Sequence, residues 1–142
     1  MAKLSYPPRV GRIALAVAVI AMTSMLLAAG SAAAPVYNGP ATRATAQADR
    51  RAHITAPPKS DIATGKPTMR FAFKLTRNTG EVAVYRTHTD AVKALAQAEA
   101  LAKAFGQSLK GLAAVYGNVI IGFDKRPTSG ERTETQGWLR TH

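Results

Sequence analysis

The 142-residue chain contains no cysteine. Disulfide frameworks, thiolate metal sites and thiol redox chemistry are therefore excluded, so the stability of the fold must come from packing. Acidic residues are also scarce, because 8 Asp and Glu stand against 19 Lys and Arg. The resulting formal charge of +11 predicts attraction to anionic surfaces.

An apolar run from Ile13 to Ala29 follows three positive residues, Lys3, Arg9 and Arg12, and precedes small residues that continue to Ala34. This order is typical of a secretory signal peptide. Residues 1–34 are therefore predicted to be a signal peptide or an uncleaved single-pass membrane anchor, because the run's length suits either. Both alternatives place the rest of the chain outside the cytoplasm, either secreted or in the cell envelope.

Residues 35–68 are rich in Pro, Ala, Thr and Arg and contain Tyr37 as their single aromatic residue. Few large apolar side chains leave little surface to bury, so the entropy lost on ordering is not offset. The segment is predicted to be a disordered linker. Residues 69–142 are then the folded domain.

The folded domain is predicted to begin with a β-hairpin. Apolar residues alternate with polar or small ones from Met69 to Leu75, which is the period of a strand with one buried face. Asn78 and Gly80 suit a turn, and a second strand follows at 82–85.

A long helix is predicted next, from Asp90 to Tyr116, because one helical face collects most of the large apolar residues. These residues are Leu95, Ala98, Leu101, Ala102, Phe105, Leu109, Leu112 and Tyr116. The alternative ends the helix near Phe105 and forms a hairpin from 112–116 and 119–123 around Gly117 and Asn118.

A third strand at Val119–Phe123 and a last helix from Ser129 to Arg140 complete the prediction, the helix docking through Trp138 and Leu139. The fold class is α+β with the order ββαβα. A right-handed crossover would place the third strand parallel to the second, in a three-stranded sheet with the long helix on one face.

Catalytic residues, metal ligands and cofactor sites are not predicted anywhere in the chain. The three histidines, His53, His88 and His142, are far apart in the sequence, and no nucleophile motif or phosphate-binding glycine loop occurs. No small-molecule substrate follows from the sequence, so the prediction is a protein without enzymatic activity.

The first predicted binding surface lies on the open face of the sheet, where alternation places Arg70, Lys74 and Tyr85. Nucleic acid is not an expected partner, because Phe71 and Phe73 alternate onto the buried face and leave no exposed pair of aromatic rings for base stacking.

The second predicted binding surface is an anion-binding loop before the last helix, made of Lys125, Arg126, Thr128 and Ser129. Two cations there precede the exposed amide groups of a helix N-terminus. The competing reading of the same residues is an ordinary capped loop.

Together these features predict a basic interaction module that binds an acidic protein or an anionic envelope surface. The membrane is a partner only if the N-terminal segment is not cleaved. The alternative function is a small secreted enzyme inhibitor or chaperone-like domain that acts by edge-strand pairing.

Overall fold

The computed structural model describes residues 33–56 and 65–142. The chain divides into two units, 1–33 and 34–142, and the second contains every element described below. Its described residues form a five-stranded sheet and three helices. The predicted export segment lies outside the described residues except for Ala33 and Ala34. Within the described part of the chain, no helix is both long enough and apolar enough to cross a membrane.

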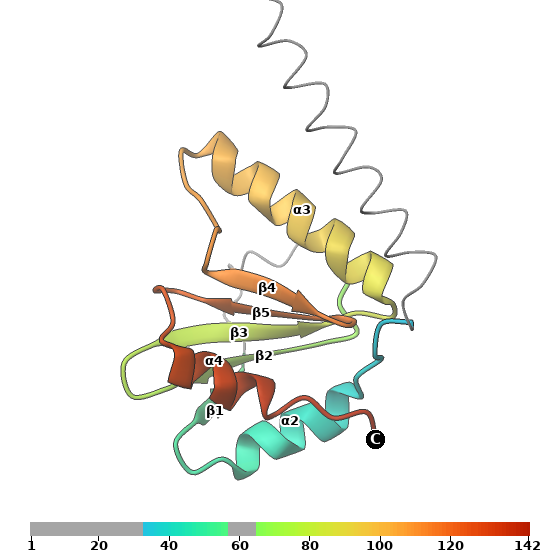
Figure 1. Cartoon of the computed structure of the whole chain (residues 1–142), viewed down its shortest axis with the longest axis vertical. Helices are drawn as coiled ribbons and strands as arrows, with labels where there is room; N and C mark the ends of the chain where they lie inside the picture. Colours follow the sequence, from blue (N-terminus) through green and yellow to red (C-terminus); the bar gives the residue numbers. More distant parts are fainter. Residues whose placement is uncertain (1–32, 57–64) are drawn as a thin grey trace, which may run out of the picture. The chain divides into compact units, whose positions relative to one another are not determined.

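All neighbouring strands of the sheet are antiparallel, in the order β1-β2-β3-β5-β4 (Figure 1). The strands are β1 (His53–Thr55), β2 (Met69–Lys74), β3 (Thr79–Val84), β4 (Ala113–Tyr116) and β5 (Val119–Phe123). The predicted α+β class and the β2–β3 hairpin are confirmed. The predicted three-stranded sheet is wrong, because β5 pairs with β3 in the antiparallel direction and two further strands extend the sheet.

The main core lies between one face of the sheet and two helices, α2 (Gly39–Ala48) and α4 (Ser129–Gln136) (Figure 1). Phe71 and Phe73 point into it, as the alternation in β2 predicts, and both are fully buried. Trp138 follows α4 and packs edge-on against Phe73 with ring centroids 5.2 Å apart. Its predicted docking role is therefore confirmed, but the predicted helix end at Arg140 is wrong, because α4 ends at Gln136 and Trp138 lies beyond it.

A smaller core lies on the other face of the sheet, beneath α3 (His88–Ala104). Ala91 and Ala94 of the helix pack there against Ala83 and Tyr85. The prediction that the long helix covers the Phe71 and Phe73 face is therefore wrong. The buried residues of α3 are alanines, while Phe71 and Phe73 lie on the face that α2 and α4 cover.

The helix also ends earlier than the predicted boundary at Tyr116. Gly106 has a φ of +70°, and the amide groups of Phe105 and Gln107 both donate to the carbonyl of Ala102, which closes the last turn. The alternative hairpin is the one that forms, with β4 and β5 joined at Gly117 and Asn118. Leu101 and Phe105, predicted to face the core, are 45% and 73% exposed.

The predicted linker is also corrected over residues 35–56, because these residues form α2 and β1. Ala46 and Thr42 of α2 are fully buried. The amide of Asn38 donates to the carbonyl of Arg140 at 2.7 Å, so this segment binds the C-terminal end of the chain. Residues 57–64 of the predicted linker lie outside the described residues.

Candidate functional site: a basic end of the sheet

The strand register brings three connections to one end of the sheet. Lys74 pairs with Thr79 around the β2–β3 turn, and Gly80 pairs with Phe123 at the end of β5. Ala113, at the start of β4, pairs with Gly122. The β2–β3 turn, the loop between α3 and β4, and the loop between β5 and α4 therefore meet at the same end of the sheet, on the left in Figure 1.

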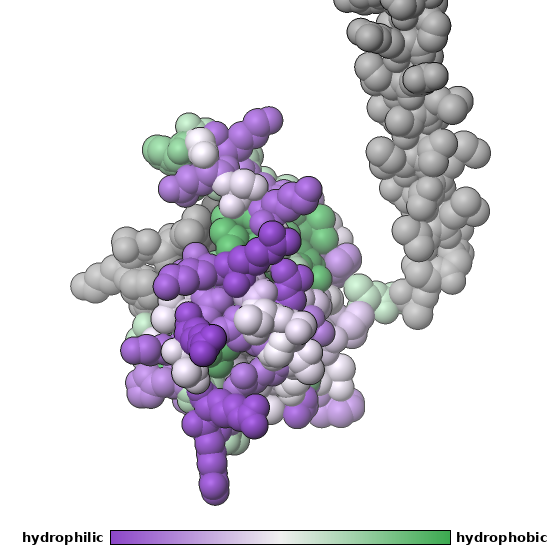
Figure 2. Space-filling model, turned by 60° about the vertical axis from the view of Figure 1, so that its left-hand side comes forward, coloured by the Kyte–Doolittle hydropathy of each residue, from purple (hydrophilic) through white to green (hydrophobic). Residues whose placement is uncertain are grey.

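Cationic side chains from four stretches of sequence gather at this end, which we call the basic end. It comprises Lys74, Arg77, Lys110, Lys125, Arg126 and Arg132. All except Arg132 are exposed, and a guanidinium nitrogen of Arg132 donates to the carbonyl of Gly111 at 3.3 Å. Figure 2 turns this end toward the viewer and shows mostly hydrophilic residues on it.

The two carboxylates at the basic end are both engaged in hydrogen bonds. Asp124 accepts from the hydroxyl of Thr79. Glu131 accepts from the amide of Thr128 at 2.8 Å, and the Thr128 hydroxyl accepts from the amide of Glu131 at 3.1 Å. Six cations stand against these two carboxylates, so positive charge is in excess at this end of the sheet.

The predicted anion-binding loop forms part of the basic end, but its helix N-terminus is already capped. Thr128 and Glu131 form a complete capping box at the start of α4. Glu131 thus supplies the negative charge that a bound anion would bring to these amides. Lys125 and Arg126 remain exposed, while Thr128 and Ser129 act in the structure as an ordinary helix start.

The predicted surface of Arg70, Lys74 and Tyr85 does not form as expected. The three residues share a face, but Tyr85 is 3% exposed because it packs under α3. Arg70 is half-buried and forms an ion pair with Glu81 at 2.6 Å. Only Lys74 is exposed, and it belongs to the basic end.

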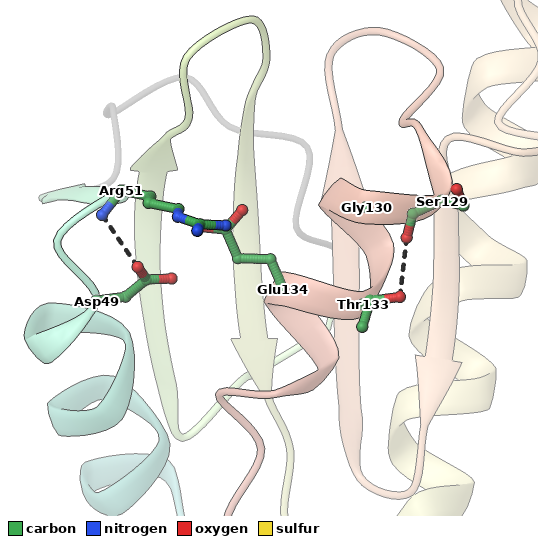
Figure 3. Close-up of a pocket in the computed structure, with 6 residues that line it drawn as sticks. All are labelled: Asp49, Arg51, Ser129, Gly130, Thr133 and Glu134. Atoms are coloured by element: carbon green, nitrogen blue, oxygen red, sulfur yellow. Dashed lines mark hydrogen bonds between the residues drawn. The ribbon is translucent and has the colours of Figure 1, made fainter.

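A second polar feature, not predicted from the sequence, lies where the end of α2 meets α4. A shallow pocket of about 500 Å³ is lined there by Asp49, Arg51, Ser129, Gly130, Thr133 and Glu134 (Figure 3). Asp49 accepts hydrogen bonds from the Trp138 indole at 2.9 Å and from the Arg51 amide at 3.0 Å. No motif spacing reveals this pair of carboxylates, because 85 residues separate Asp49 from Glu134.

The two carboxyl groups have pKa values shifted in opposite directions. Burial raises the pKa of Glu134, and the neighbouring Asp49 raises it further by accepting a hydrogen bond and by its charge. Burial also acts to raise the pKa of Asp49, but hydrogen bonds from Trp138 and Arg51 outweigh it, so this pKa is lowered. As the pH falls, Glu134 therefore takes up a proton before Asp49 does.

We expect Glu134→Gln to stabilise the protein at neutral pH, by less than about 1 kcal/mol because solvent screens a partly exposed pair. The folded-state pKa of Glu134 is raised, so its contribution to stability is present below its unfolded value and is lost as pH rises through the folded value. The gain in the variant should therefore shrink at pH 4. Urea unfolding followed by the fluorescence of Trp138, the single tryptophan, measures both values.

The matched control for this prediction is Glu99→Gln, which removes an exposed carboxylate from α3. Its effect should be small at both pH values. Equal stabilisation by the two variants would show that reduced charge, and not the Asp49 pair, is the cause.

The histidines and acidic residues do not form a metal cluster in the part of the chain that the structure describes. His88 contacts the carbonyl of Gly117 through Nδ1 at 2.7 Å, and His53 is an exposed residue of β1.

The described residues define a small α+β protein whose antiparallel sheet is covered by helices on both faces and is strongly basic at one end. No protein-family model matches the chain, and neither a curated protein nor a solved structure matches it.

Proposed function

We propose that the protein is an exported, non-enzymatic interaction module whose basic end binds an acidic protein. The observation that carries the proposal is the gathering of six cations from four separate stretches of sequence around two carboxylates that already have partners. A protein surface with this excess of one charge attracts partners of the opposite charge and raises their association rate.

The shape of the basic end supports a macromolecular partner. Five of its six cations lie on exposed loops and strand ends, and the sixth, Arg132, lies on α4. A broad, exposed, charged surface suits a protein or polymer, since pockets for small molecules are concave and mostly apolar. The export of the module is proposed from residues 1–34, and the intact mass of the native protein in membrane and soluble fractions distinguishes a cleaved chain from an anchored one.

The charge-reversal variant Arg77→Glu with Lys125→Glu should weaken binding to poly-L-glutamate, used as a model acidic polypeptide, by about tenfold or more. Tenfold corresponds to about 1.4 kcal/mol, or roughly 0.7 kcal/mol for each reversed charge at an exposed site. Binding of the wild-type protein should also weaken as salt increases, because exposed charges are screened. Fluorescence anisotropy of labelled poly-L-glutamate measures both effects.

The matched control is Lys93→Glu with Lys103→Glu, which changes the net charge equally on the exposed side of α3. This control should lose less than about threefold in affinity. An equal loss in both variants would mean that net charge, and not the basic end, governs binding, and it would contradict the proposal.

A further inference from the structure

The outer edge of the sheet at β4 lacks the features that usually prevent an edge strand from pairing. Its four residues, Ala113, Ala114, Val115 and Tyr116, include no charge and no proline. Natural edges are commonly protected by lysine, proline, bulges or inward charges. Within residues 33–56 and 65–142, no strand lies beyond β4.

The register shows which backbone groups of β4 point away from the sheet. The carbonyl of Leu112 accepts a hydrogen bond from the amide of Phe123 at 2.8 Å. Because inward and outward backbone groups alternate along an antiparallel strand, Ala114 and Tyr116 also direct their backbone groups toward β5. Ala113 and Val115 therefore direct their backbone groups outward. The Ala113 amide donates to the Leu109 carbonyl at 3.3 Å. Three outward groups therefore remain to pair with an added strand: the Val115 amide and the carbonyls of Ala113 and Val115.

The charge beside this edge is strongly asymmetric. Gly111 lies two residues before β4, and Arg132 donates to its carbonyl at 3.3 Å. Arg126 lies close to the same residue, since a Cβ built on Gly111 would lie 3.8 Å from its Nε atom. Lys110 is the preceding residue in the chain. Three cations of the basic end therefore lie beside the start of β4, whereas the Gly117–Asn118 turn at its other end contains neither lysine nor arginine.

We propose that β4 binds an extended segment of the acidic partner, which pairs in the antiparallel direction and ends in acidic residues. An antiparallel strand continues the pattern of the whole sheet and can form hydrogen bonds with the three outward backbone groups of Ala113 and Val115. Its C-terminal end then lies beside Lys110, Arg126 and Arg132. This inference rests on the proposed function and names the form of the partner that the basic end recognises.

The test compares two synthetic peptides of equal composition, Thr-Val-Thr-Val-Glu-Glu and Glu-Glu-Thr-Val-Thr-Val, with both termini blocked. The first places its carboxylates beside the three cations and should bind the full-length protein about tenfold more tightly. Equal affinity for the two peptides would overturn the predicted direction of pairing.

Val115→Pro removes the outward amide of the edge strand and should weaken binding of the first peptide by about tenfold or more. Val115→Ala is the matched control, because it also loses side-chain contacts but keeps the amide. Equal affinity of both variants would overturn the edge-pairing proposal. If Val115→Pro fails to fold, hydrogen exchange of the Val115 amide in the wild-type protein decides: about tenfold slower exchange with peptide supports pairing, and unchanged exchange overturns it.

The experiments distinguish a failure of the proposed function from a failure of this inference. Arg77 and Lys125 do not lie among the three cations at β4, and their reversal tests binding of poly-L-glutamate. Loss of poly-L-glutamate binding in that variant, with equal peptide affinity in Val115→Pro and Val115→Ala, would leave the basic end as the site and remove only the strand pairing.

Discussion

Trp138→Ala is expected to lower the free energy of unfolding by about 3–5 kcal/mol, the usual cost of deleting a buried aromatic side chain. Trp138 is 2% exposed and packs edge-on against Phe73. Its indole also donates to Asp49 at 2.9 Å, so the substitution removes a hydrogen bond from a carboxylate as well as apolar contact. Urea unfolding followed by circular dichroism measures the loss, since the variant has no tryptophan fluorescence.

Leu101→Ala is the matched control for this prediction, because Leu101 is a large apolar residue that is 45% exposed. It should cost less than about 1 kcal/mol. Trp138→Phe separates the two contributions, since it keeps an aromatic ring but removes the donor to Asp49. If Trp138→Ala costs no more than Leu101→Ala, the arrangement of the main core described here is wrong.

Asn118→Ala is expected to lower the free energy of unfolding by about 2–4 kcal/mol, because buried groups left without hydrogen bonds are costly. The Asn118 side chain is 2% exposed. It accepts from the amide of Tyr37 at 2.6 Å and donates to the carbonyls of Tyr37 and Tyr85 at 3.1 and 2.8 Å. One side chain thus binds the segment before α2 to the sheet.

Hydrogen exchange locates this effect as well as measuring it. The Tyr37 amide should exchange faster in Asn118→Ala, while amides in the middle of β3 should follow only the change in global stability. Thr76→Ala, which removes an exposed hydroxyl from the β2–β3 turn, is the control and should change neither quantity. Unchanged exchange at Tyr37 would show that Asn118 does not hold the N-terminal segment.

The β2–β3 hairpin and the start of α4 were predictable because their determinants are local. Alternation from Met69 to Leu75 predicts which face of the strand is buried, because successive side chains of a strand point to opposite faces. This holds for any helix that covers the face. The capping box of Thr128 and Glu131 likewise depends on residues three apart. Such patterns act before any long-range contact forms.

The end of α3 was mispredicted because the apolar stripe continues by coincidence beyond it. Gly106 adopts a φ of +70° and ends the helix, a conformation that the apolar stripe does not reveal. Leu112 keeps the spacing of the stripe but lies in the connection to β4. The pairing of β4 with β5 favours the hairpin over a longer helix. Helix periodicity carries no information about this pairing.

The prediction of a disordered linker is wrong over residues 35–56 because low hydrophobicity does not by itself prevent a segment from packing. The residues of α2 that are buried are small, namely Gly39, Thr42 and Ala46, and they need little surface of their own to pack closely. Hydrogen bonds from distant residues hold this segment in place, since the Arg140 amide donates to the Thr42 hydroxyl and the Trp138 indole donates to Asp49, directly after α2. Composition within one segment carries no information about those contacts.

The sequence by itself determined the fold class, the first hairpin, the burial of Phe71, Phe73 and Trp138, and the excess of positive charge. Each follows from local periodicity, capping or composition. Only the tertiary structure decided the sheet order, the face that α3 covers and the gathering of six cations at one end. These depend on strand register between residues far apart in the chain, and many registers satisfy the same local pattern until the cores on both faces select one.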